Sequence, residues 1–168
     1  MIMITGGSKC GKSRYAESLF QSITKNKYYI ATMIPYGDEA ESAIARHRKM
    51  RENKRFFTIE QYTDIDKSPI PMHSAVLLEC MGNLVANEMF QDEKITDCTN
   101  KIIDNILSLN KKTDLLVIVT NQVGNDGITY ASGTARYIES LGKINRVLSN
   151  YADCVIECVY GIPVKLKG

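Results

Sequence analysis

The segment Met1–Ser13, MIMITGGSKCGKS, decides the fold of this chain. Its first five residues are mostly apolar and run into a pair of glycines, a pattern typical of a short buried strand that stops at a tight turn. The stretch Ser13–Thr24 follows, with apolar side chains at helical spacing. A strand, a glycine-rich loop and a helix in this order predict the start of an α/β domain.

Within this segment, one motif matches G-x-x-x-x-G-K-[ST] at every position, namely Gly6-Gly7-Ser8-Lys9-Cys10-Gly11-Lys12-Ser13. Its glycines let backbone N–H groups point at phosphate oxygens, and the following helix adds the positive end of its dipole. We expect Lys12 to reach the β- and γ-phosphates and the Ser13 hydroxyl to ligate Mg²⁺. The loop predicts binding of a nucleoside triphosphate, but a kinase, an ATPase motor, a GTPase switch and a nucleotidyl transferase all remain open.

The rest of the chain continues to alternate between strands and helices. Apolar runs predict strands at Lys27–Thr32, Phe56–Glu60, Ser74–Cys80, Asp114–Thr120 and Ala152–Val159, with a short antiparallel terminal strand at Val164–Lys167. Charged or amphipathic stretches predict helices at Glu39–Arg55, Asn83–Phe90, Asp97–Leu109 and Arg136–Tyr151. Apolar strands of this kind are buried on both faces. The sequence therefore predicts one domain over residues 1–168, an α/β fold of the P-loop NTPase (RecA-like) class with a mostly parallel sheet and helices on both faces.

Candidate site residues stand where the predicted strands end, which is where ligands bind in parallel sheets. They follow the first strand and lie around Thr32, at Glu79 and at Asn121. A carboxylate at Glu79 can hold the water shell of a metal or orient a nucleophile, although a partly exposed strand end is the alternative. The GTPase motifs D-x-x-G and N-K-x-D are missing at the corresponding places, so a GTPase switch is not expected.

His47 is one of two histidines and lies in a basic run, Arg46–Arg51. A neutral imidazole can attack a phosphorus centre and form a covalent intermediate. The surrounding cations favour that neutral form and would stabilise phosphate charge in a transition state. An ordinary histidine on a solvated basic helix face is the alternative, and the residues alone leave both open. His73 is expected to be a loop residue.

Composition limits the class of protein. The chain has 168 residues, of which 44% are hydrophobic and 24% charged, which is ordinary for a globular domain. With 21 basic and 19 acidic residues, it lacks the basic excess of a nucleic-acid binder, so no such partner is expected. Five cysteines without a CxxC pair indicate reduced thiols. No apolar run approaches the roughly 20 residues of a membrane helix, so we expect a cytoplasmic protein without membrane insertion.

Several segments together resemble one family, the bifunctional adenosylcobinamide kinases / adenosylcobinamide-phosphate guanylyltransferases of cobalamin biosynthesis. The matching pieces occur in family order over nearly the whole chain. They are T-G-G-x-x-x-G-K-S-R at Thr5–Arg14, Y-I-A-T at Tyr29–Thr32, I-x-x-H-R/K-x-x-R at Ile44–Arg51, T-x-E at Thr58–Glu60, L-L-E-C at Leu77–Cys80, V-T-N-x-V-G at Val119–Gly124, A-R-[YF]-I-[DE]-x-x-G-x-x-N at Ala135–Asn145, and the ending G-I-P-V-K-L-K.

The resemblance implies two reactions. One phosphorylates the aminopropanol hydroxyl of adenosylcobinamide, and the other transfers GMP from GTP to that phosphate, giving adenosylcobinamide-GDP and pyrophosphate. It implies GTP and ATP as substrates, Mg²⁺ as cofactor, a small-molecule corrinoid as acceptor and a homotrimer as the assembly. It also implies that the histidine of the I-x-x-H segment, here His47, carries GMP as a phosphoramidate. With Lys12 of the phosphate loop, His47 is the expected catalytic residue.

The resemblance also places the nucleotide contacts. They are expected at Gly6, Gly7, Ser8, Lys9, Cys10, Gly11, Lys12, Ser13, Ala31, Thr32, Met33, Arg48, Lys49, Met50, Arg51, Glu60 and Glu79. The chemistry of the side chains agrees for Arg48 and Arg51, because a guanidinium offers a bidentate fork to phosphate. Ser13 and Glu79 are the expected Mg²⁺ ligands.

One departure from the family lies at Gln122. The family often shows N-E-V-G where this chain has Asn121-Gln122-Val123-Gly124, and the loss of a carboxylate removes a candidate base or metal contact. A narrower function is therefore open, in which the chain transfers GMP but has lost the kinase step. A P-loop ATPase of another class, such as a recombinase-type motor, and a non-catalytic nucleotide sensor also remain open.

Overall fold

One mixed sheet organises the part of the chain that the computed structural model describes, which is residues 1–52, 54–91 and 95–168. The side chains at positions 39, 40, 43, 47 and 50 also lie outside this description. The strands cross the sheet in the order β3-β2-β4-β5-β1-β6-β7. Their bounds are β1 Ile2–Thr5, β2 Lys27–Ala31, β3 Phe56–Glu60, β4 Ser74–Glu79, β5 Thr113–Val119, β6 Cys154–Val159 and β7 Ile162–Lys167.

Neighbouring strands are parallel throughout this sheet except at one edge, where β7 runs antiparallel to β6. Parallel neighbours need a crossover, whereas antiparallel neighbours can be joined by a tight turn. The turn between β6 and β7 consists of Tyr160 and Gly161, both with positive φ. The predicted fold class is confirmed, including the antiparallel strand at the end of the chain.

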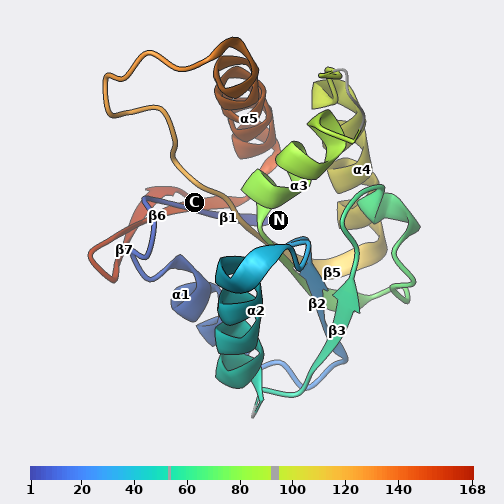
Figure 1. The fold of residues 1–168 in the computed structure, drawn as a ribbon. Coiled ribbons are helices and arrows are strands. Elements are labelled where there is room, and N and C mark those ends of the chain that lie inside the picture. The colour runs from blue at the N-terminus through green and yellow to red at the C-terminus, as the bar shows by residue number, and fades with distance from the viewer. Residues whose placement is uncertain (53, 92–94) are drawn as a thin grey trace.

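Helices cover both faces of the sheet, as Figure 1 shows. Three of them, α3, α4 and α5, gather over one face, while α1 and α2 lie on the other side. Their bounds are α1 Lys12–Ser18, α2 Gly37–Arg51, α3 Met81–Met89, α4 Thr99–Lys112 and α5 Ser132–Tyr151, with a 3-10 turn η1 at Ile65–Lys67. None of the helices in the described ranges has the length and apolar character that crossing a bilayer requires.

Two apolar clusters fill the space between the sheet and its helices. Every residue of β4 is buried, and its successive side chains alternate between the clusters, so that Leu78 joins Ile106 of α4 and Leu77 joins Phe20 beyond α1. This alternation follows from the period of two along a strand. The sheet is therefore a fixed platform with core on both faces, and the ends of its strands are held in place.

The helix after the phosphate loop is shorter than the sequence predicts. Its apolar spacing predicts Ser13–Thr24, but α1 ends at Ser18. Beyond that point, backbone N–H groups such as that of Phe20 bond to carbonyls three residues earlier, which is the tighter 3-10 pattern. Phe20 is still buried, so the apolar periodicity reports burial correctly but not the hydrogen-bond pattern.

The basic helix α2 is displaced from its predicted bounds. The sequence predicts Glu39–Arg55, but the helix begins at Gly37 and ends at Arg51. Since β3 starts at Phe56 and pairs there with Lys27 of β2, the chain must reverse direction within residues 52–55. The sheet register, rather than helix propensity, sets the end of α2.

We expect Gly6→Ala to destabilise the protein. Gly6 has a φ of 141°, and a Cβ there would lie 2.5 Å from the carbonyl oxygen of Cys158 and 2.8 Å from Sγ of Cys10. Strain and overlap together should cost about 2 kcal/mol or more. Urea unfolding would measure the loss, with Gly7→Ala as the matched control, because a Cβ at Gly7 meets nothing within 4 Å. Equal stability of the two variants would contradict the prediction.

Candidate functional site

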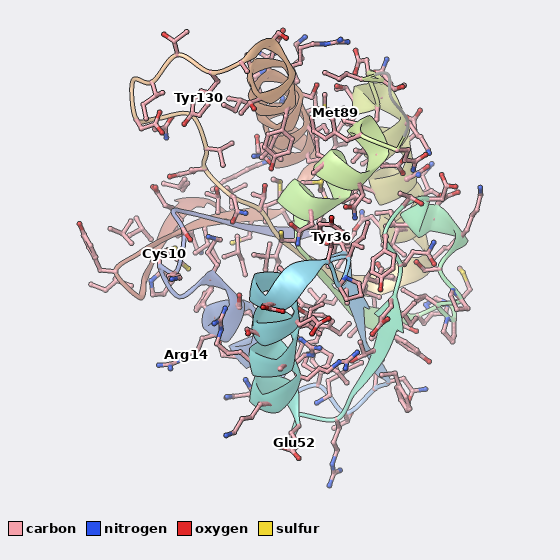
Figure 2. All side chains as sticks on the ribbon, viewed as in Figure 1. Cys10, Arg14, Tyr36, Glu52, Met89 and Tyr130 are labelled. Carbon is pink, nitrogen blue, oxygen red and sulfur yellow. The ribbon has the colours of Figure 1, made fainter. Side chains whose placement is uncertain are left out.

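Five neighbouring strands end at one edge of the sheet and surround a cavity of about 1440 Å³. The register aligns Ala31, Glu79 and Val119 at the ends of β2, β4 and β5. It also pairs Thr5 of β1 with Glu157 of β6. In Figure 2, Cys10 marks the phosphate loop that forms one wall of the cavity, and Tyr36 and Glu52 mark the two ends of α2, which contributes another wall.

The phosphate loop holds Lys12 at the floor of this cavity. The ammonium Nζ of this buried side chain donates hydrogen bonds to the carbonyl oxygens of Gly6 at 2.9 Å and Gly7 at 2.5 Å. Gly11 adopts a left-handed conformation, with φ of 99°, directly before α1 begins. The lysine charge and the positive end of the α1 dipole therefore meet at the same point, which favours an anionic ligand there.

Glu79 is held at the end of β4 by donors from two other elements. Ser13 of α1 donates from its hydroxyl to Oε1, and Tyr29 of β2 donates to Oε2 at 3.0 Å. Burial first, and then the Glu79 carboxylate, raise the pKa of Tyr29 far above its usual value. The phenol therefore remains a hydrogen-bond donor, and the carboxylate is fixed beside the start of α1.

Arg51 fastens the last turn of α2 to the cavity wall. Its guanidinium carbon lies 3.5 Å from the centroid of the Tyr29 ring, and the side chain is only 7% exposed. A cation above an aromatic ring is attracted by the negative face of the ring, and more strongly away from water. This contact joins α2 to β2 at the level where Tyr29 also contacts Glu79.

The corner around Arg51 has polar atoms that the protein itself does not satisfy. Among the described residues, Arg51 Nε and Nη1 and one oxygen of Glu17 are buried without a hydrogen-bond partner. The other Glu17 oxygen accepts a hydrogen bond from Lys54. Leaving such a donor unpaired costs about 1–3 kcal/mol. Arg51 also lines the cavity, so its positive charge favours an anionic ligand there.

Thr32 joins the segment after β2 to the segment after β4. Its hydroxyl donates to the Cys80 carbonyl oxygen at 2.8 Å and accepts from the Cys80 N–H at 2.7 Å. Asn87 of α3 donates to the Thr32 carbonyl oxygen at 2.7 Å. The Thr32 side chain is fully buried in this arrangement, while its neighbours Ala31 and Met33 line the cavity. The hydrogen bonds of Thr32 therefore hold its two neighbours, Ala31 and Met33, at the cavity, although Thr32 itself does not line it.

The remaining predicted contacts lie on and beside α2. Arg48 donates to Glu60 of β3 at 2.7 Å, which forms an exposed ion pair beside the cavity rather than in its wall. Lys49 is exposed. His47 and Met50 belong to α2, but their side chains lie outside the described residues.

Sequence reasoning did not select the residues that β6 contributes to the cavity. Glu157 of β6 and Tyr160 of the turn after it line the cavity, and the side-chain amide of Gln122 donates to Oε1 of Glu157 at 2.9 Å. Because β6 borders β1 directly, the rule that ligands bind at carboxyl ends of strands would have found these residues if applied to Ala152–Val159.

The oxygen atoms of Ser13 and Glu79 are the donor set next to the phosphate loop that suits a cation. Mg²⁺ prefers such hard oxygen ligands, keeps several waters, and typically uses one or two protein groups together with substrate phosphates. No group of three or more His, Cys, Asp or Glu that could hold a metal alone occurs in the described parts of the chain. The donor set therefore fits a cation that enters with a triphosphate.

This chain is similar to known proteins over nearly its whole length. A model of the family "Cobinamide kinase / cobinamide phosphate guanyltransferase" matches residues 2–166. Proteins called "Bifunctional adenosylcobalamin biosynthesis protein CobU" from Escherichia coli strain K12 and Salmonella typhimurium strain LT2 are 33% and 32% identical, each over 99% of both chains. The "Bifunctional adenosylcobalamin biosynthesis protein CobP" of Pseudomonas aeruginosa is 24% identical over 99% of this chain and 96% of its own.

Arg51→Lys should weaken both stability and triphosphate binding. A lysine keeps the charge but loses the planar group that covers Tyr29 and offers two donors to a phosphate. We expect the free energy of unfolding to fall by about 1 kcal/mol and the Kd for a triphosphate to rise about tenfold. Urea unfolding and calorimetric titration would measure these, with the exposed Arg55→Lys as control. Wild-type values in both measurements would contradict the role assigned to Arg51.

Proposed function

Because this chain belongs to the cobinamide kinase / cobinamide phosphate guanyltransferase family, we propose that it catalyses both reactions of its family name on adenosylcobinamide. It phosphorylates the aminopropanol hydroxyl and then transfers GMP from GTP to the new phosphate, which yields adenosylcobinamide-GDP. The observation that carries the proposal is a complete phosphate loop that lines one cavity together with residues of the histidine-bearing helix α2.

The phosphate loop supplies the charge that both reactions need. Lys12 and the N-terminus of α1 supply positive charge where we expect the β- and γ-phosphates to bind, and Arg51 adds positive charge in the cavity wall. Ser13 and Glu79 would hold Mg²⁺, which neutralises charge on the phosphate oxygens when it is bound. Donors fixed in this way stabilise developing charge without rearranging during the reaction.

The backbone of α2 supports a role for His47. Ile44 and Arg51 both line the cavity, and position 47 lies three residues after one and four residues before the other. Residues at such spacings share one face of a helix. Helical spacing thus groups position 47 with Ile44 and Arg51, which supports the proposal that its histidine is the nucleophile for GTP.

In the proposed guanylyl transfer, a neutral imidazole nitrogen of His47 attacks the α-phosphorus of GTP. A nitrogen–phosphorus bond forms as the bond to the bridging oxygen breaks, and pyrophosphate leaves. A phosphate oxygen of adenosylcobinamide phosphate then attacks the same phosphorus. The nitrogen–phosphorus bond breaks, the imidazole is regenerated, and a new pyrophosphate linkage remains in the product.

The other classes of protein with such a phosphate loop, a motor ATPase and a non-catalytic nucleotide sensor, are less well supported. The relatives are named as bifunctional biosynthesis proteins over nearly their full length, which favours the transferase over a motor ATPase or a non-catalytic sensor. We further propose GTP and ATP as the nucleotide substrates, a corrinoid as the acceptor, a homotrimeric assembly and a cytoplasmic location. These finer assignments rest on the family resemblance and on the near-neutral charge of the chain.

Incubation with GTP labelled at the α-phosphorus should label the protein covalently. A phosphoramidate is labile in acid and stable in alkali, so the label should disappear after acid treatment only. We expect His47→Ala to abolish the label and His73→Ala to retain it, because these are the two histidines and His73 pairs with Asp114 away from the cavity. A wild-type protein that binds GTP but takes up no label would refute the His47 assignment.

Lys12→Ala should impair both half-reactions. One phosphate site serves both in this proposal, so losing its ammonium should slow phosphorylation and guanylyl transfer by about 100-fold each. Each reaction is assayed separately, with adenosylcobinamide or its phosphate as acceptor. Lys111→Ala, at the exposed end of α4, is the control. Normal guanylyl transfer by Lys12→Ala would show that the two reactions use different phosphate sites.

A further inference from the structure

Glu157 is a carboxylate in an unexpected place. It lies in β6 between Ile156 and Cys158, both of which are buried, and β6 is a strand with neighbours on each side. Glu157 itself is only half-buried, because its side chain faces the cavity instead of the apolar core. Its side chain reaches the cavity, where Glu157 and Glu79 are the two carboxylates among the described lining residues. A carboxylate that faces a cavity from an otherwise largely buried strand is a candidate functional residue.

The surroundings of Glu157 are tied to the phosphate loop. Its register partner is Thr5, the residue directly before Gly6. The Gly6 carbonyl oxygen accepts hydrogen bonds from Lys12 Nζ at 2.9 Å and from the Gln122 backbone N–H at 3.2 Å. The side chain of Gln122 then donates to Glu157 at 2.9 Å. A continuous set of contacts therefore connects the lysine at the phosphates with this carboxylate.

The two carboxylates of the cavity have different tasks available to them. Ser13 and Tyr29 donate to the two oxygens of Glu79, which keeps that group at the start of α1. The Gln122 side-chain amide donates a hydrogen bond to Oε1 of Glu157, and no second hydrogen bond to this carboxylate is found within the described residues. Its Oε2 can therefore accept a proton from a bound hydroxyl group, which an amide at position 122 cannot do.

We propose that Glu157, oriented by Gln122, is the general base of the phosphorylation step. This inference rests on the proposed function, since it assigns a residue to one of the two reactions. Glu157 takes the proton of the acceptor hydroxyl as the oxygen of that hydroxyl bonds to the γ-phosphorus. The bond between the γ-phosphorus and the bridging oxygen breaks, and the nucleoside diphosphate leaves with the electron pair. The N-E-V-G pattern has a carboxylate at position 122. In this chain, Glu157 of β6 supplies that carboxylate instead.

A general base at Glu157 is needed for phosphorylation but not for guanylyl transfer. Phosphorylation consumes a hydroxyl group whose proton must be removed, whereas guanylyl transfer to a phosphate oxygen has no such proton to remove. Glu157→Gln keeps the size and the polar character of the side chain but cannot accept the proton. We expect it to slow phosphorylation of adenosylcobinamide by about 100-fold or more, with guanylyl transfer to adenosylcobinamide phosphate within about twofold of wild type.

The test uses the full chain and four variants, Glu157→Gln, Gln122→Glu, the double variant Glu157→Gln/Gln122→Glu, and Glu139→Gln. The double variant restores a carboxylate and an amide in reversed positions, and we expect it to regain most of the lost phosphorylation rate. Glu139 is exposed on α5 and pairs with Lys143, so its variant controls for the loss of one charge.

The outcomes distinguish this inference from the proposed function. Wild-type phosphorylation by Glu157→Gln would overturn the inference and leave the proposed function intact. Equal losses in both reactions, together with a lower unfolding midpoint, would show a structural role and also overturn it. A wild-type protein that transfers GMP but forms no adenosylcobinamide phosphate would refute the kinase half of the proposed function, and the assignment of Glu157 with it.

Discussion

The close approach of the phosphate loop to β6 is the constraint on which the rest of the site depends. Gly6 lies so near the backbone of Cys158 that a Cβ would come within 2.5 Å of its carbonyl oxygen. The Gly6 carbonyl oxygen in turn accepts hydrogen bonds from Nζ of Lys12 and from the backbone N–H of Gln122. One residue without a side chain thus brings together the start of α1, the segment after β5 and the strand that carries Glu157. The parallel register makes this possible because it sets all these ends at one edge.

The helix α2 is attached by different forces from those that hold the sheet. Neither apolar cluster contains a described residue of α2. Its described contacts are instead the stacking of Arg51 on Tyr29 and the ion pair of Arg48 with Glu60, both near the C-terminal end of the helix. Since Arg51 also lines the cavity, the attached end of α2 brings a positive charge to the space where a phosphate is proposed to bind.

Local patterns predicted most of the fold and only part of the site. The bounds of Phe56–Glu60 agree because a short strand with turns on both sides is specified by its own residues. The ends of α1 and α2 differ because packing of Phe20 and the start of β3 decide them. The phosphate loop could be predicted since its chemistry lies in eight consecutive residues. The contact of Gln122 with Glu157 could not, because it joins residues 35 apart through the order of the strands.

The arrangement of charges explains how one cavity can serve two chemistries under the proposed function. A triphosphate held by Lys12 presents its γ-phosphorus and its α-phosphorus at opposite ends of the same chain of phosphates. Glu157 lines the cavity from β6, while Ile44 and Arg51 line it from α2, the helix that carries the proposed nucleophile. The cavity of about 1440 Å³ also exceeds the roughly 300–1,000 Å³ of an ordinary ligand pocket, which leaves room for part of a corrinoid beside the nucleotide. Under the proposed function, separate groups from β6 and α2 would allow proton removal at one phosphorus and nucleophilic attack at the other without a second phosphate site.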